Sequence, residues 1–108
     1  MKTETVVNAL GLTLLAGEMP ESFDGVYAGD FLSRAMSRVS EGDLWITIMN
    51  NINVIAVASL TDAAAVILAE DVVMDRSVLD AACAKGVCVY SSGKTVYELC
   101  RDIANVIS

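Results

Sequence analysis

The sequence predicts a single α/β domain spanning residues 1–108, with a central, mostly parallel sheet of about four to five strands and helices on both faces. The length of 108 residues fits one domain. From residue 44 onward, segments typical of strands and of helices alternate. The strand-like segments are continuous apolar runs, which is the pattern of parallel strands buried on both faces.

The first half of the chain is predicted to hold two helices and two short strands. A helix over residues 3–10 has Thr3 or Thr5 as its cap and Gly11 as its stop. Short apolar segments favour strands at 12–16 and 26–28, and the loop between them contains the single proline. Asp30 is expected to cap a second helix to about residue 39, whose apolar face contains Phe31, Leu32, Ala35, Met36 and Val39.

The second half is predicted to alternate strictly between strands and helices. Residues 44–49, 63–68 and 87–90 are expected to form buried strands, with Trp45 and Tyr90 in the core. Helices are expected over residues 52–60, with Asn50 and Asn51 before it, over 75–85, with Asp75 as cap and Gly86 as stop, and from 94 to the end of the chain. The last helix carries an apolar stripe at Val96, Leu99, Cys100, Ile103, Val106 and Ile107.

Composition excludes several classes of function. Hydrophobic residues make up 55% of the chain, which is enough to build a core. Histidine is absent, so Ser-His-Asp and Cys-His nucleophiles, histidine general bases and histidine metal ligands are all excluded. The carboxylates form no strong pair either, and together with the incomplete phosphate-binding motif described below these observations lead us to expect no catalytic residue, no metal site and no cofactor.

Charge and hydropathy argue against nucleic acids and membranes as partners. Seven Lys and Arg residues, scattered along the chain, face fourteen Asp and Glu residues, and this balance repels phosphate backbones and anionic lipids. Residues 52–69 approach the length of a membrane span, but Asp62 lies near the middle and marks a turn instead. No signal-peptide pattern is found at the amino terminus. We expect a cytoplasmic protein whose three cysteines, Cys83, Cys88 and Cys100, are reduced and buried.

Polar residues follow each of the predicted parallel strands, and ligands of open parallel sheets bind outside the carboxyl ends of the strands. The turn from Ser92 to Thr95 also opens a helix, so its backbone N–H groups make it the best anion or phosphate site, although it is equally a good turn and cap. The predicted ligand-binding residues are Asn50, Asn51, Asn53, Glu70, Asp71, Ser91, Ser92, Lys94 and Thr95.

The sequence Gly93-Lys94-Thr95 is part of the phosphate-binding loop motif of nucleotide hydrolases, but the rest of the motif is missing. The motif requires a glycine five positions before Gly93, and Cys88 stands there. Too few residues follow Thr95 to supply the strand and acidic residue that hold Mg²⁺. A nucleotide hydrolase is therefore not expected.

The order of several short motifs resembles the DRTGG domain family, most closely its short stand-alone members. These motifs are Gly42-Asp43-Leu44-Trp45-Ile46-Thr47, residues 53–60, residues 64–70, residues 86–91 and residues 95–99. The resemblance covers residues 3–107, and it extends to the N-terminal domain of HPr kinase/phosphorylase. It implies a dimeric α/β domain that accompanies CBS-domain pyrophosphatases and phosphotransacetylases as a non-catalytic, regulatory module.

The chain departs from the motif that names the family. Where the family has Gly-Asp-Arg after a strand, this chain has Met49-Asn50-Asn51, and where the family has Thr-Gly-Gly after the next strand, it has Ala69-Glu70-Asp71. Both departures fall at the carboxyl ends of predicted strands. A ligand held elsewhere through the arginine or the glycines is therefore not implied here.

Three functions fit these observations. The first is a homodimeric, non-catalytic regulatory module that binds a small molecule, such as a nucleotide or an anion, or a partner protein at the carboxyl edge of the sheet. The second is an interaction or scaffold domain without a small-molecule ligand. The third is a small enzyme that uses Lys94 or a cysteine thiolate. A protein partner in a redox or metabolic system follows from the resemblance alone.

Overall fold

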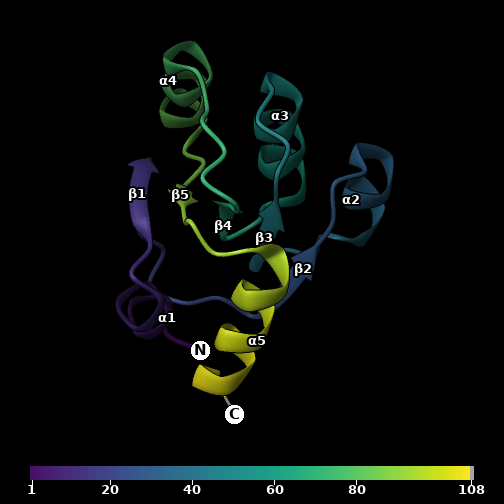
Figure 1. Ribbon diagram of the computed structural model, residues 1–108. Helices are drawn as coiled ribbons and strands as arrows, with labels where there is room; N and C mark the ends of the chain where they lie inside the picture. Colours follow the sequence, from purple (N-terminus) through teal and green to yellow (C-terminus); the bar gives the residue numbers. More distant parts are fainter. Residues whose placement is uncertain (108) are drawn as a thin grey trace.

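The computed structural model describes residues 1–107, which form one sheet flanked by helices (Figure 1). In chain order the elements are α1 (Thr3–Leu10), β1 (Thr13–Ala16), β2 (Gly25–Ala28), α2 (Leu32–Arg38), β3 (Asp43–Thr47), α3 (Ile52–Thr61), β4 (Ala65–Leu68), α4 (Arg76–Lys85), β5 (Val89–Ser91) and α5 (Val96–Ile107).

The sheet has the strand order β1-β5-β4-β3-β2. Strands β2 to β5 run parallel to their neighbours, whereas β1 pairs antiparallel with β5 and has a bulge between Leu14 and Ala16. The predicted fold class, an α/β domain with a mostly parallel sheet, is confirmed.

The helices divide unequally between the two faces of the sheet (Figure 1). Helices α2, α3 and α4 lie side by side on one face, and α1 and α5 lie together on the other. Each connection from β2 through β5 moves the chain one strand in the same direction, so the three connecting helices share a face. After β5 the chain crosses to the opposite face and forms α5.

Strand β3 shows how the two faces are filled. The Trp45 side chain packs with the core beneath α2, α3 and α4, and its neighbours Leu44 and Ile46 pack with the core beneath α1 and α5. All three are essentially inaccessible to solvent, as successive side chains of a doubly covered strand must be. Trp45 and Tyr90 are core residues, as predicted.

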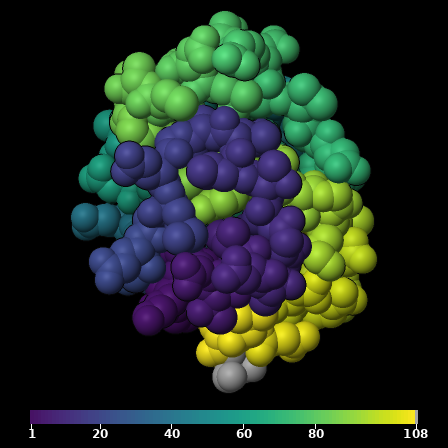
Figure 2. Space-filling view, turned by 90° about the vertical axis from the view of Figure 1, so that its left-hand side faces the viewer, coloured from purple at the N-terminus to yellow at the C-terminus, as the bar shows by residue number. Residues whose placement is uncertain are grey.

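The antiparallel strand β1 closes one side of the molecule. Figure 2 views this side and shows the N-terminal residues, in purple, between α4, in green, and α5, in yellow. Strand β1 contacts both β5 and α4. The edge at β1 is therefore partly covered by the rest of the fold, whereas β2 forms the opposite edge.

Several predicted helix signals are confirmed. Gly11 and Gly86 have positive φ angles of 64° and 71° and end α1 and α4. The Asn51 side chain accepts a hydrogen bond from the Asn53 amide at 2.9 Å and so caps α3. These signals act through the geometry of residues within a few positions of one another.

Two predicted caps are wrong, and a third, Asp75, is at the N-cap position without a side-chain bond. Asp30 does not cap α2, because its Oδ1 atom accepts hydrogen bonds from Thr47 and Ile48 at the end of β3. Neither Thr3 nor Thr5 caps α1, since the helix already begins at Thr3 and Lys2 precedes it without a side-chain bond. Asp75 precedes α4, but its side chain forms no capping hydrogen bond.

Some predicted apolar positions are exposed. Phe31 and Met36 are 68% and 52% exposed, because α2 has a neighbouring helix, α3, on one side only. Cys83 is also exposed, which corrects the expectation that all three thiols are buried; Cys88 is buried and Cys100 half-buried. A short helix at the end of a layer buries a narrower face than its apolar pattern indicates.

Strand ends differ slightly from the prediction. Strand β3 ends at Thr47 instead of residue 49, β4 begins at Ala65, and β5 extends to Ser91, which had been placed in the following turn. Between residues 1 and 107, no helix combines the length and the apolar character that crossing a bilayer requires.

Candidate functional site

The chain diverges at the carboxyl ends of β4 and β5. The segment after β4 leads to α4 on one face of the sheet, and the segment after β5 leads to α5 on the other face (Figure 1). In open parallel sheets this divergence between adjacent strands is where ligand-binding crevices form. Six of the nine predicted site residues lie at this point: Glu70, Asp71, Ser91, Ser92, Lys94 and Thr95.

Backbone hydrogen bonds hold the two diverging segments together. The Glu70 amide donates to the Lys94 carbonyl at 2.9 Å, and the Asp71 amide donates to the Ser92 carbonyl at 3.0 Å. A Cβ atom on Gly93 would lie 3.2 Å from both carboxyl oxygens of Asp71, so the close approach of these loops favours glycine there. The structure thus brings together residues that are about twenty positions apart in sequence.

Glu70 and Asp71 adopt a strained backbone conformation. Their φ angles are 60° and 57°, in the left-handed region that residues other than glycine rarely occupy. These are the two positions at which the DRTGG motif carries glycine. The chain retains acidic side chains despite an energetic cost of about 1–2 kcal/mol per residue. Backbone strain of this kind concentrates at functional sites, which supports a role for this loop.

The three asparagines after β3 have other partners at the same edge. Asn50 Nδ2 donates to the Val73 carbonyl at 2.6 Å and so ties the β3–α3 connection to the segment after β4. Asn51 caps α3 and accepts from the Asn53 amide, and both residues are exposed. Asn50, Asn51 and Asn53 therefore lie along the predicted edge, where Asn50 supports the Glu70–Val73 segment.

The amino end of α5 is closed by a capping box. Thr95 Oγ1 accepts from the Glu98 amide at 3.1 Å, and Glu98 Oε1 accepts from the Thr95 amide at 2.9 Å. The hydrogen bond from the Thr95 backbone holds the pKa of Glu98 below its usual range. Ser92 Oγ accepts from the Lys94 amide at 3.1 Å. Side chains of this chain therefore already bind three N–H groups at the amino end of α5, those of Lys94, Thr95 and Glu98.

Lys94 is held by an ion pair on α5. Its Nζ atom lies 3.0 Å from Asp102 Oδ2, while Arg101 Nε donates to Asp102 Oδ1 at 2.9 Å. The hydrogen bonds from Arg101 and then Lys94 lower the pKa of Asp102. The Lys94 side chain thus extends along α5 toward Asp102 and is bound to a carboxylate there.

A cavity of about 280 Å³ opens beside the diverging segments. Two predicted residues, Asp71 and Ser91, supply its polar lining, and its apolar walls are Leu15, Val72, Val73, Met74 and Leu79. The apolar residues come from β1, from the segment after β4 and from α4. The sequence did not predict these residues, because only polar residues were expected at the strand ends and apolar residues were expected to pack in the core.

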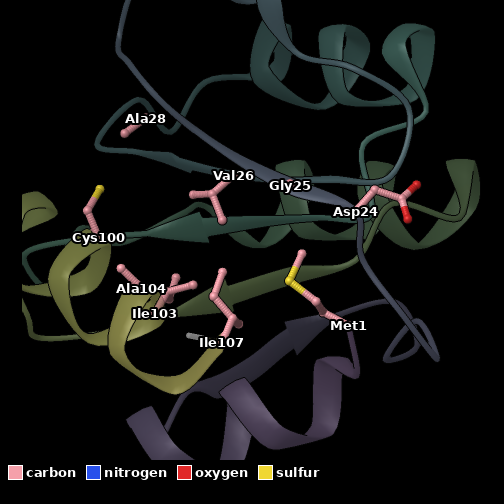
Figure 3. A pocket seen from close by; sticks show the side chains of 9 residues that line it. All are labelled: Met1, Asp24, Gly25, Val26, Ala28, Cys100, Ile103, Ala104 and Ile107. Atoms are coloured by element: carbon pink, nitrogen blue, oxygen red, sulfur yellow. The ribbon is translucent and has the colours of Figure 1, made fainter.

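A second, larger cavity lies away from the predicted edge. It is a groove of about 450 Å³ between α5 and the edge strand β2, and Figure 3 shows its lining. Val26 and Ala28 line it from β2, and Cys100, Ile103, Ala104 and Ile107 line it from α5. None of the predicted site residues contributes to this groove.

Acidic and cysteine side chains are the candidates for metal binding or nucleophilic chemistry. No three acidic or cysteine side chains within residues 1–107 are grouped so that they could hold a metal ion. Burial raises the pKa of the Cys88 thiol to about 11, and the neighbouring Tyr90, also desolvated, has its pKa raised to about 12. Cys88 is therefore a protonated core residue at neutral pH and no nucleophile.

Comparisons with known proteins support the fold. No family model matches the chain, and no curated protein matches it. Among solved structures, the fold is similar to the CBS and DRTGG domains of the regulatory region of a pyrophosphatase from Clostridium perfringens, solved with the activator diadenosine tetraphosphate. The TM-score is 0.76 at 13% sequence identity, and the match covers 97% of this chain and 46% of that chain. The chain therefore has a fold seen in a regulatory region that contains a DRTGG domain.

Proposed function

We propose that this protein is a non-catalytic regulatory module that binds a small molecule in the cavity between Asp71 and Ser91. One observation carries the proposal. Asp71, in the segment after β4, and Ser91, at the end of β5, both line a cavity of about 280 Å³, at the point where the connections of these two parallel strands part to opposite faces. A strained loop positions one of them, Asp71.

The lining favours a ligand of about the size of a nucleobase or nucleoside. A volume of about 280 Å³ lies just below the range of drug-sized sites, roughly 300–1,000 Å³, and so suits a smaller ligand. Five apolar side chains suit a flat, apolar ring, and the Asp71 carboxylate suits an amino or hydroxyl donor. Lysine and arginine are absent from the lining, so the phosphates of a nucleotide would project toward solvent.

The ligand class is supported by the similar structure as well. That regulatory region was solved with a dinucleotide activator, and we extend the nucleotide class, though not that compound, to this chain. The resemblance to DRTGG domains supports a homodimer in the cytoplasm that passes ligand binding on to a protein partner. Exposed Phe31, Met36 and Leu60, near or on α2 and α3, are candidates for a dimer contact.

A thermal-shift titration tests the ligand half of the proposal. The wild-type chain is screened with adenosine, guanosine, AMP, ATP, diadenosine tetraphosphate and inorganic phosphate. Asp71→Gly removes the carboxylate and relieves the positive φ, so it abolishes stabilisation by the ligand without unfolding the chain. Glu70→Gly is the matched control, because it relieves the same kind of strain at a residue that does not line the cavity.

Two results would contradict the proposal. Failure of every compound to raise the melting temperature at millimolar concentration would leave the cavity without a nucleoside ligand. Stabilisation that survives in Asp71→Gly but disappears in Lys94→Ala would place the ligand at the amino end of α5 instead. Size-exclusion chromatography with light scattering tests the homodimer, and a monomer at micromolar concentration would overturn that part.

A further inference from the structure

The face of the sheet that carries α1 and α5 is incompletely covered at β2. Three helices cover the opposite face, but only α1 and α5 cover this one (Figure 1). Val26 of β2 points to this side and remains 37% exposed beside Ile103 and Ala104 of α5 (Figure 3). The result is the apolar groove of about 450 Å³ that runs along the strand.

Strand β2 is also an edge strand that lacks the usual protection. One side of β2 pairs with β3, and no strand of the described chain pairs with the other side. Its residues, Gly25-Val26-Tyr27-Ala28, include no proline and no charge, and the strand has no bulge. The other edge strand, β1, is bulged. Edge strands without a bulge, proline or charge are templates for pairing with another strand.

One end of the groove is acidic overall, with three carboxylates near the single amino group of Met1, which also lines the groove and donates to the Phe23 carbonyl at 3.2 Å. Asp24 precedes β2 at this end, and its carboxylate lies against Gly42 in the neighbouring turn. Asp43 stands opposite Gly25 in the register of β2 and β3, and Glu41 precedes it by two residues. None of the ion pairs among residues 1–107 includes any of these three acids.

We propose that β2 and this groove bind an extended peptide segment of a partner protein by strand addition. The peptide backbone pairs with the open edge of β2 over about four residues, the length of the strand. Alternate apolar side chains of the peptide enter the groove between Val26 and Ile103, and a lysine or arginine of the peptide lies near Asp24. Backbone pairing supplies affinity, while the groove and the carboxylate supply specificity.

A second copy of this chain fits the site less well. In a dimer formed by pairing β2 with β2, the residues that meet this edge are those around β2 of the second copy. That segment, residues 21–33, contains the acids Glu21, Asp24 and Asp30 and no lysine or arginine. Acid would therefore face acid or uncharged backbone, and like charges across strands are destabilising. A basic peptide complements the edge where a second copy does not.

Fluorescence anisotropy with labelled peptides tests the proposal. The probe is Lys-Val-Thr-Val-Thr-Val, compared with the same peptide carrying Glu for Lys and with one carrying Pro in place of the central Val. The wild-type chain binds the lysine peptide most tightly, and the proline peptide fails because it cannot pair along a strand. Asp24→Asn brings the affinities for the lysine and glutamate peptides close to equality.

Two further variants locate the binding on the surface. Ala104→Phe fills the groove and raises Kd by about tenfold or more, whereas Ala84→Phe, at an exposed alanine of α4 on the other face, leaves Kd unchanged. Should Ala104→Phe fail to fold, Ala28→Lys blocks the strand edge with a charge and has the same effect. Asp71→Gly removes a carboxylate from the proposed ligand cavity, which lies away from the groove, and should leave the Kd for the peptide unchanged.

Three outcomes would overturn the inference. The first is no anisotropy change at millimolar peptide with the wild-type chain. The second is binding that Ala104→Phe and Ala28→Lys leave intact, which places the peptide elsewhere. The third is a wild-type dimer that either variant converts to a monomer, which makes a second copy the occupant. Chromatography with light scattering of each variant separates the third outcome from the first two.

Discussion

Thr47 at the end of β3 donates a hydrogen bond from Oγ1 to Asp30 Oδ1 at a distance of 2.8 Å. The same carboxyl oxygen accepts from the Ile48 amide at 2.9 Å, and Thr47 Oγ1 accepts from the Met49 amide at 3.1 Å. Thr47 is completely buried. Asp30 therefore fastens the carboxyl end of β2 to that of β3, next to the connection that carries Asn50.

Replacement of Thr47 by valine tests this link. Thr47→Val keeps the shape of the side chain but leaves the Asp30 carboxylate and the Met49 amide each without one partner. We expect a loss of about 1–3 kcal/mol in the free energy of unfolding, measured by urea denaturation followed through the fluorescence of Trp45. Thr13→Val, at an exposed position of β1, is the control and is near neutral; equal stability of the two variants would contradict the role of the link.

Two glycines with similar backbone angles should respond differently to alanine. Gly11 and Gly17 have φ angles of 64° and 75°, but a Cβ on Gly11 meets nothing within 4 Å, while one on Gly17 would lie 2.6 Å from the Val87 carbonyl oxygen. Gly11→Ala should cost about 1 kcal/mol from the backbone angle alone. Gly17→Ala should cost clearly more, because the β1–β5 region must shift. Chemical denaturation of both variants compares them, and similar losses would show that the contact is relieved at no cost.

The capping box of α5 makes a pH-dependent contribution to stability. Thr95→Ala removes the cap and should lower the free energy of unfolding by about 1 kcal/mol, whereas Ser77→Ala on the exposed first turn of α4 should not. Glu98 has its pKa lowered from the usual 4.5 in the folded chain. Its contribution is therefore complete above about pH 5.5 and is lost as the pH falls through the lowered folded pKa.

Glu98→Gln isolates this charge, because glutamine retains an oxygen that can accept from the Thr95 amide. The difference in stability between the wild-type chain and Glu98→Gln should be constant near neutral pH and should shrink below about pH 5. Urea titrations at several pH values measure this difference. A difference that grows as the pH falls would reverse the sign and contradict the assignment.

Relief of the backbone strain at Glu70 should raise the free energy of unfolding. Glu70→Gly should raise the free energy of unfolding by up to about 1 kcal/mol, because glycine adopts a φ of 60° without the steric cost that glutamate bears. Glu4→Gly, in the first turn of α1, is the opposite control and should lower it by a similar amount. A Glu70→Gly variant less stable than the wild-type chain would mean that the side chain makes a contact worth more than the strain.

The three thiols should react at very different rates. Cys83 is exposed, whereas Cys88 is buried with a pKa of about 11 and Cys100 is half-buried with a pKa raised by burial. Iodoacetamide at pH 8 should alkylate Cys83 first, leave Cys88 unmodified in the folded chain and label all three in urea. Peptide mass spectrometry identifies the sites, and a Cys83→Ser variant should lose the fast phase. Rapid alkylation of folded Cys88 would show that the core around Tyr90 opens readily.

Elements set by local chemistry were predictable from the sequence. The strand–helix alternation after residue 43, the buried strand around Trp45, the stops at Gly11 and Gly86 and the Asn51 cap all depend on residues within a few positions of one another. Asp30 was mispredicted for the opposite reason. Its position before a helix favours a cap, but Thr47 and Ile48, brought near by the pairing of β2 and β3, compete for the same carboxylate.

The candidate site likewise has features that were predictable from the sequence and features that were not. The sequence by itself determined which polar residues follow the parallel strands, because strand ends are marked by local breaks in apolar runs. Only the tertiary structure decided that Asp71 and Ser91 share a cavity with Leu15 while Lys94 is bound to Asp102. It also decided that β2 is an open edge. Strand order and the placement of α5 arise from packing between distant segments, and no local pattern of residues records either of them.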